Sequence, residues 1–153
     1  MPSGLLFGHD ETVASWLFNS YGRAPLKYDK ALGILSGEGV IIGAILFHGY
    51  NGANVELSYF GKGTMTLGIV RCLARFIIHE FDASRLTAVT SKKRRRLIKS
   101  FQKLGWRVEG TQRCYYGKLD NSRNTGVRFV MFREQIEKLA KLDIVQANLE
   151  ASK

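Results

Sequence analysis

Apolar residues in the first half of the chain form two short runs and one alternating segment, which are patterns typical of β-strands. The two runs, 31–35 and 40–47, flank a glycine-rich turn and predict an antiparallel hairpin. From 54 to 59 apolar and polar residues alternate with a period of two, as in a half-buried strand: Val55, Leu57 and Tyr59 against Glu56 and Ser58. A hairpin and a further strand are therefore expected.

Two other segments repeat their apolar residues at steps of three and four, the spacing of a helix face. Residues 66–81 predict a helix with a wide apolar face: Leu67, Val70, Leu73, Ile77 and Phe81. Residues 10–18 predict a shorter helix, which we expect the Asp10 side chain to cap.

The second half of the chain alternates shorter strands and helices. The expected order is a strand over 85–89, a helix that Ser91 caps and that ends before Gly105, and strands over 106–113 and 127–132. The polar stretch 117–126 predicts a mobile loop, and residues 133–150 predict a last helix with a frayed end.

This order of elements predicts an α/β fold, with a mixed, mostly antiparallel sheet and helices on both of its faces. The chain has 153 residues, 45% of them hydrophobic, and shows neither an internal repeat nor a linker. We therefore expect residues 1–153 to form a single domain around one core.

The net charge of the chain indicates the kind of partner that it could bind. The 23 Lys and Arg against 13 Asp and Glu give a formal net charge of +10, which attracts polyanions. Five cations are consecutive: Lys92, Lys93, Arg94, Arg95 and Arg96. At the start of a helix they would oppose the helix dipole, so a bound anion, either a phosphate-rich cofactor or a nucleic acid, would compensate them. A solvated face screened by salt is the alternative.

Other features narrow the class of protein. Residues 1–10 lack the basic and apolar regions of a secretion signal, and no apolar stretch approaches the ~20 residues that cross a bilayer. We therefore expect a cytoplasmic protein without a membrane partner. Cys72 and Cys114 lie far apart and outside metal-ligand spacing, which predicts reduced thiols and no metal site.

The stretch that begins at Arg85 resembles the GNAT superfamily, the acyl-CoA N-acyltransferase fold. Members of that family carry a strand reading roughly R-L-x-A-x-V, a helix ending in E-K-L-G-F and a strand starting x-x-E-G. The matching stretches here are Arg85 to Val89, Gln102 to Trp106 and Arg107 to Gly110. The likeness covers residues 30–113 and is closest in style to short bacterial and phage members.

The resemblance implies that two parallel strands, 54–59 and 85–89, splay apart and form the groove for the pantetheine arm of CoA. It also implies that the CoA pyrophosphate binds at the start of the following helix, on backbone N–H groups. The residues implied to bind the cofactor, acetyl-CoA as acyl donor, lie along the groove, at this helix start and in the basic run: Leu57, Ser58, Tyr59, Gly63, Thr64, Met65, Thr66, Leu67, Gly68, Ser91, Lys93 and Arg94.

The chain departs from the family pattern at two places. The phosphate loop of the family usually reads Q/R-x-x-G-x-G/A, but here Gly61 and Gly63 come early and only Gly68 lies inside the expected segment. Phe101 stands where many members place a tyrosine that protonates the leaving thiolate. Phenylalanine carries no acidic proton, so the acid must be another group or water.

Three side chains are candidates for the proton transfers that amine attack on a thioester requires. Glu56 lies on the strand where many family members carry a glutamate base. His48 follows the preceding strand, and an imidazole can accept a proton near neutral pH. Tyr116, with Tyr115, ends the strand after Trp106, where it could donate a proton or line the acceptor pocket. The plainer alternatives are solvated side chains for Glu56 and His48, and strand packing for at least one tyrosine.

These features together predict an N-acetyltransferase that moves an acetyl group from acetyl-CoA to an amine by direct attack. The alternative is a GNAT-fold protein, of the kind found in phages, that modifies or binds nucleic acid through Lys92 to Arg96. The acceptor stays open, and so does the choice between a monomer and a homodimer.

Overall fold

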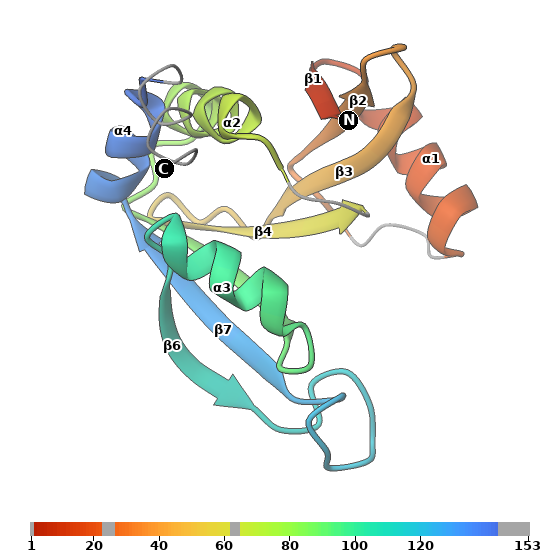
Figure 1. The fold of residues 1–153 in the computed structure, drawn as a ribbon, viewed down its shortest axis with the longest axis vertical. Helices are drawn as coiled ribbons and strands as arrows, with labels where there is room; N and C mark the ends of the chain where they lie inside the picture. Colours follow the sequence, from red (N-terminus) through yellow and green to blue (C-terminus); the bar gives the residue numbers. More distant parts are fainter. Residues whose placement is uncertain (1, 23–26, 62–64, 144–153) are drawn as a thin grey trace, which may run out of the picture.

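A computed structural model describes residues 2–22, 27–61 and 65–143 (Figure 1). Its elements are β1 (Pro2–Leu6), α1 (Asp10–Tyr21), β2 (Lys30–Ser36), β3 (Ile41–His48), β4 (Asn54–Gly61), α2 (Leu67–Glu80), β5 (Arg85–Ser91), α3 (Arg95–Lys103), β6 (Arg107–Gln112), β7 (Gly126–Phe132) and α4 (Arg133–Ala140). The strands form one sheet in the order β1-β2-β3-β4-β5-β7-β6. The β4–β5 pair is parallel and the other neighbouring pairs of this described sheet are antiparallel. The predicted mixed, mostly antiparallel sheet is confirmed.

Helices cover the two faces of the sheet unequally. On one face, here called the helix face, α2 and α4 pack against each other, and together with Phe101 of α3 they bury apolar side chains of β2 to β5 and β7 (Figure 1). On the opposite face α1 packs on β2 and β3, where Val13 and Leu17 contact a smaller cluster. This face continues over β4, β5 and β7, and we call it the open face. There α1 reaches β4 through Tyr21, whose ring contacts Phe60 with centroids 5.6 Å apart.

Local sequence explains where α2 begins. The Thr66 hydroxyl accepts a hydrogen bond from the Ile69 N–H at 3.2 Å, which satisfies one of the N–H groups that a helix start leaves without a helical partner. Five buried side chains then fix the helix to the sheet: Ile69, Val70, Leu73, Ala74 and Ile77. The helix predicted over 66–81 is therefore present with its apolar face inward.

Two predicted helix caps are wrong. Asp10 lies inside α1, and its carboxylate accepts a hydrogen bond from the Ala31 N–H at 3.0 Å, so it ties the helix to β2. Ser91 is the last residue of β5, and α3 begins four residues later at Arg95. The Ser91 hydroxyl instead accepts from the Lys93 N–H at 3.3 Å and stabilises the turn between strand and helix.

Because α3 begins at Arg95, most of the basic run Lys92 to Arg96 precedes the helix that it was predicted to start. Lys92 and Lys93 are in the turn, Arg94 flanks the helix start, and only Arg95 and Arg96 belong to the first turn of α3. Fewer cations than expected therefore oppose the helix dipole.

Three further outcomes concern the ends and one loop. The strand β1 was not predicted. The loop before β7 is irregular, as expected, and is tied by several hydrogen bonds, among them Asn124 Nδ2 to the Leu119 carbonyl at 2.8 Å. The predicted helix 133–150 is present as α4 only up to Ala140, residues 141–143 are not helical, and the part from 144 onward lies outside the described residues. None of the described helices has the length and apolar character needed to cross a bilayer.

Candidate active site

The parallel strands β4 and β5 pair along only half of their length. Pairing runs from Asn54 opposite Arg85 to Leu57 opposite Ala88. Beyond that point β4 continues to Gly61 beside β3, and β5 continues beside β7, without pairing to each other. Figure 1 shows the end of β4 diverging from β7 and α3. We call the end of the pairing, at Leu57 and Ala88, the apex of the splay.

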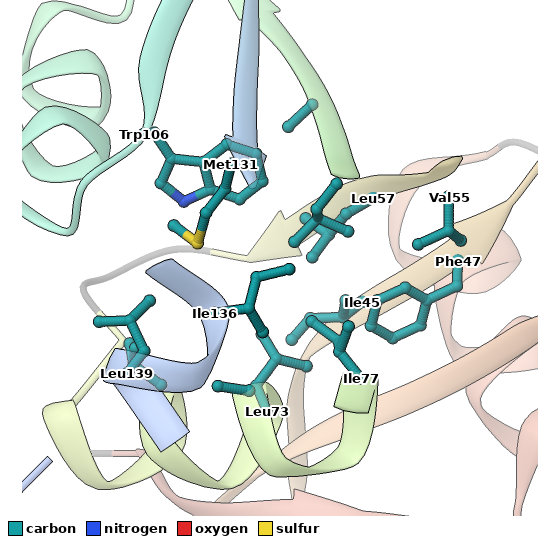
Figure 2. Close-up of a cluster of buried hydrophobic side chains, with 14 of the residues drawn as sticks. Ile45, Phe47, Val55, Leu57, Leu73, Ile77, Trp106, Met131, Ile136 and Leu139 are labelled. Carbon is teal, nitrogen blue, oxygen red and sulfur yellow. The ribbon is translucent and has the colours of Figure 1, made fainter. Parts of the chain in front are cut away.

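On the helix face a cavity lies beside the apex. Its empty volume is about 510 Å³, counting its open mouth. Figure 2 shows side chains of β4, α2, α4 and β7 that converge on this part of the core. The lining is almost entirely carbon: Leu57, Tyr59, Met65, Val70, Leu73, Ala74, Ile77, Leu86, Phe101, Leu104, Trp106, Met131, Ile136 and Leu139.

On the open face the same strand carries a polar network. His48 of β3 lies opposite Glu56 of β4 in the antiparallel register, and the next open-face residue of β4 is Ser58. His48 Nδ1 lies 3.3 Å from Glu56 Oε2, and His48 Nε2 lies 2.9 Å from Ser58 Oγ. If Nδ1–H donates to the Glu56 carboxylate, Nε2 is left to accept the Ser58 hydroxyl proton. We call these three residues the open-face relay.

The network extends across β5 to β7 and β6. Arg128 Nη2 lies 3.8 Å from Glu56 Oε1, and Arg128 Nε lies 3.6 Å from Glu109 Oε1. Glu109 also accepts a hydrogen bond from Arg85 Nη2 at 2.6 Å, and this bond, with the two guanidinium charges, holds the pKa of Glu109 below its ordinary value. Ser58, which contacts His48, is at one end of this network and one residue past the apex.

A basic and aromatic surface lies where β5 ends and β7 begins. Lys92 N–H donates to the Thr125 carbonyl at 2.8 Å, and the Ser91 hydroxyl donates to the Arg123 carbonyl at 3.0 Å. These bonds join the basic turn to the loop that carries Tyr115 and Tyr116. The tyrosine rings contact edge to face with centroids 4.8 Å apart, and the two residues are 50% and 46% exposed.

Electrostatics connects this surface with the splay. Burial, followed by the charge of Tyr115, raises the pKa of Tyr116 to about 12, while the positive charge of Arg94 acts in the opposite direction. Arg94 acts in the same way on Tyr59, whose pKa burial also raises. Arg94 therefore lies within electrostatic range of both the cavity lining and the tyrosine pair. Among the described residues, none of Lys92 to Arg96 takes part in an ion pair.

No family model and no curated protein sequence matches the chain. Solved structures do match it. The ribosomal-protein-S5-alanine acetyltransferase from Vibrio fischeri superposes with a TM-score of 0.64 at 12% identity, over 85% of this chain and 92% of that one. A GNAT-family acetyltransferase from Bacillus anthracis gives a TM-score of 0.56 at 15% identity, over 88% and 98%. The chain has the GNAT fold.

A third match carries ligands. The spermidine N-acetyltransferase from Vibrio cholerae, solved in complex with CoA and spermine, superposes with a TM-score of 0.57 at 11% identity, over 80% of this chain and 75% of that one. The splayed parallel pair that the GNAT resemblance implied is thus present here, together with the sheet order around it.

The residues predicted to bind CoA fall into separate groups in this GNAT fold. Leu57, Tyr59 and Met65 line the cavity, whereas Ser58 lies on the open face beside His48. Gly63 and Thr64 lie outside the described residues.

The start of α2 has room for a small side chain at Gly68. Among the described residues, a Cβ built on Gly68 would meet only Thr66 Oγ1, at 3.8 Å. Lys93 and Arg94 lie across the splay, in the turn that follows β5. Binding of the CoA pyrophosphate at this helix start, with the cations of that turn across the splay, stays a prediction.

Among the predicted catalytic residues, Glu56 and His48 are brought together and Tyr116 is not. Tyr116 lies in the loop after β6, which ends at Gln112, and its ring contacts Tyr115 rather than a residue of the relay. Sequence reasoning missed Ser58 as a partner of His48, and it missed Arg128 and Glu109. The spacing of Glu56 and Ser58 on one strand face was the available signal for Ser58.

Proposed function

We propose that the protein is an acyl-CoA-dependent N-acyltransferase, in which an amine attacks the thioester directly at the apex of the splay. The observation that carries this proposal is the position of the open-face relay one residue from the apex. The solved acetyltransferases that share the fold support it. Acetyl-CoA is the simplest donor of this class.

The relay suits removal of a proton from the acceptor. An amine must lose a proton as it forms the new C–N bond, and the Ser58 hydroxyl can pass that proton to His48 Nε2, 2.9 Å away. Glu56 then acts as a positioning residue, because its carboxylate orients the imidazole and stabilises the cation that forms. This assigns the base to His48 and changes the role first expected for Glu56.

The leaving group needs little help from the protein. When the C–S bond breaks, the sulfur departs as a thiolate, and a thiol of pKa ~8.5 is an acceptable leaving group without a strong acid. Phe101 lines the cavity and offers no proton. Water can therefore protonate the thiolate.

Thiol release from acetyl-CoA in the presence of an amine panel tests the proposal. We expect turnover only with amines, and a large loss in a His48→Gln variant that still binds CoA. A thermal-shift series measures that binding, since CoA at 100 times its dissociation constant adds ~2.7 kcal/mol to the stability. A wild-type protein that neither binds CoA nor releases thiol would contradict the proposal.

Mass spectrometry of the protein distinguishes direct attack of the amine on the thioester from a route through an acylated enzyme. We expect no acyl adduct on Ser58 after mixing the protein with acetyl-CoA alone. An adduct there, absent in Ser58→Ala, would replace direct attack by two steps through an acyl-serine.

A second function, nucleic-acid modification or binding, is favoured by the basic and aromatic surface. Exposed tyrosines can stack on unpaired bases, and the cations of the adjoining turn can bind phosphates. The test is binding of short single-stranded DNA and RNA. Tyr115→Ala should weaken binding by ~1 to 3 kcal/mol if a base stacks there. Equal binding by the variant and the parent would leave the surface without this role.

A further inference from the structure

We propose that the acceptor is a small amino acid, a compound whose amine and carboxylate are a few bonds apart. Its carboxylate binds to the guanidinium of Arg128 while its amine reaches the open-face relay. This inference rests on the proposed acyl-CoA-dependent function and names the acceptor class for that same site.

Arg128 lies in line with the relay across the splay. Ser58 of β4 and Val89 of β5 are the first residues past the apex, and Val89 lies opposite Arg128 in the antiparallel register. Residues opposite each other on neighbouring strands share a face of the sheet. The guanidinium of Arg128 reaches over β5 to Glu56 of β4, where Nη2 lies 3.8 Å from Oε1. It is therefore close to the residues that take the proton of the amine.

The protein holds the guanidinium of Arg128 only loosely. Its contacts with Glu56 and Glu109, at 3.8 and 3.6 Å, are both longer than a hydrogen bond. Glu109 is instead hydrogen-bonded to Arg85 at 2.6 Å, so another arginine compensates most of its charge. The Arg128 side chain is 31% exposed, which leaves it accessible to a small solute. Arg128 thus keeps donors in a planar fork that fits the two oxygens of a carboxylate.

The pattern of charge on the open face favours a zwitterion. With Arg85 and Glu109 paired to each other, the remaining charged side chains of this network are Glu56, which is negative, and Arg128, which is positive. An amino acid turns its ammonium group toward the carboxylate and its carboxylate toward the guanidinium, so each charge meets an opposite charge. A polyamine would bring further cations to Arg128 and to a chain whose formal net charge is +10.

Val89 gives the acceptor an apolar surface between the two polar groups. Its side chain is partly exposed. A Cβ built on Gly126 would meet Val89 Cγ1 at 3.0 Å and Tyr115 Cγ at 3.1 Å, so the Tyr115 ring lies over the same face of β7, at the residue two before Arg128. The carbon atoms that join the amine to the carboxylate then lie on Val89, beside Tyr115.

Steady-state kinetics with matched pairs of acceptors test the inference. Thiol release from acetyl-CoA is measured with glycine, β-alanine and γ-aminobutyrate, and with the amide of each acid, which lacks the carboxylate charge. Arg128→Gln should raise KM for the acids by about tenfold or more, because hydrogen bonds to a charged group are lost, and should leave KM for the amides within about twofold. The variant is compared with the wild type for each compound, so the different basicity of the amines cancels.

Two further variants make the test specific to the guanidinium. Arg128→Lys keeps the charge but not the planar fork, so KM for the acids should rise less than in Arg128→Gln. Arg107→Gln is the matched control and should leave KM for the acids unchanged. Arg107 is exposed on β6, opposite Val130 and on the same face as Arg128, and forms no ion pair with a described residue.

The amides also report on the relay. If Arg128→Gln disturbed the Glu56 carboxylate and, through it, His48, kcat would fall for acids and amides alike. Loss of the carboxylate site instead raises KM for the acids alone. The two effects therefore appear in different constants.

The outcomes separate this inference from the proposed function. If Arg128→Gln changes KM for acids and amides equally, or changes neither, the carboxylate site is overturned and the acyltransferase stays intact. Turnover of the amides alone, or of spermidine with a higher kcat/KM than every amino acid, would also overturn the site and spare the acyltransferase. Absence of thiol release with every amine would overturn both.

Discussion

The two faces of β4 differ sharply at the apex of the splay. On the helix face Leu57 and Tyr59 belong to a carbon-lined cavity. On the open face Glu56 and Ser58 belong to a network of hydrogen bonds and ion pairs with His48. Successive residues of one strand thus point into opposite chemical environments, because side chains alternate between the faces of a sheet.

Under the proposed function, this difference would let one strand serve two substrates. A charged group is unfavourable in a carbon-lined site, whereas an acceptor that must lose a proton needs polar partners. Separation by the thickness of the sheet lets both meet only at the apex. Variants on each face should therefore affect one substrate and spare the other.

The largest effect should come from the relay on the open face. Glu56→Gln keeps the shape of the side chain but removes the charge that orients His48, so kcat should fall by ~10² or more with little change in KM for the acyl donor. Steady-state kinetics with a reactive amine measures both constants.

Glu109→Gln is the control for Glu56→Gln. Glu109 pairs with Arg85 and Arg128 in the same network but does not contact His48. Equal losses in the two variants would mean that the network acts through general electrostatics, and the assignment of the relay would be wrong.

A smaller effect is expected at the start of α2, where the donor phosphates are proposed to bind. Gly68→Glu places a negative charge in the open first turn and should lower the affinity for CoA by about tenfold or more, through like-charge repulsion. Gly68→Ala is the control and should bind CoA normally, since a Cβ has space there. CoA affinity that Gly68→Glu leaves unchanged, in a folded protein, would remove this site.

The basic run should give a moderate effect on binding and a slight one on stability. Changing Lys93, Arg94 and Arg96 to Gln should weaken binding of the anionic ligand. With nucleic acid, the slope of log affinity against log salt should shrink by ~0.7 to 0.9 for each phosphate that the variant no longer binds.

The triple variant also distinguishes the two anions. If the ligand is CoA, the variant should lose affinity for acetyl-CoA but not for an acetyl thioester that lacks the nucleotide phosphates. The melting temperature should rise slightly, because two of the cations lie at the start of α3. Unchanged binding of every anion at low and moderate salt would leave only a solvated face.

The smallest effect should appear in the alkaline titration of the tyrosine pair. The pKa of Tyr116 is raised from 10.0 to about 12, so the folded protein keeps this proton while the unfolded chain loses it. Stability should therefore decline as pH rises from about 10 to 12. Tyr116→Phe should remove one tyrosinate absorbance step near pH 12 and part of that decline. An unchanged absorbance titration in the variant would contradict the assignment.

Periodicity predicted the central elements because their burial patterns are simple. Residues 54–59 alternate strictly, and the helix over 66–81 has one apolar face, so both were found. The strand β1 was missed because Pro2 and Gly4 interrupt any pattern, and its order comes from pairing with β2 rather than from its own residues. Local signals cannot report a strand that its neighbour stabilises.

Only part of the candidate site was predictable, because its contacts also depend on how neighbouring strands pair. Glu56 and His48 were found one by one, but their contact depends on the register of β3 on β4, and Arg128 reaches Glu56 only because β7 lies beside β5. The start of α3 was placed too early because lysine and arginine favour helices, while Ser91 holds a turn through its hydrogen bonds.

The splay gives this sheet more edges than its outline shows. A continuous sheet has two edge strands, but among the residues that the structure describes β4 and β5 no longer pair with each other beyond Leu57 and Ala88, which adds two more strand edges. Edges of this kind present backbone donors and acceptors that favour addition of another extended chain. Under the proposed function, the pantetheine arm, which carries amides along an extended chain, would bind there as an eighth strand, and the donor would complete the sheet.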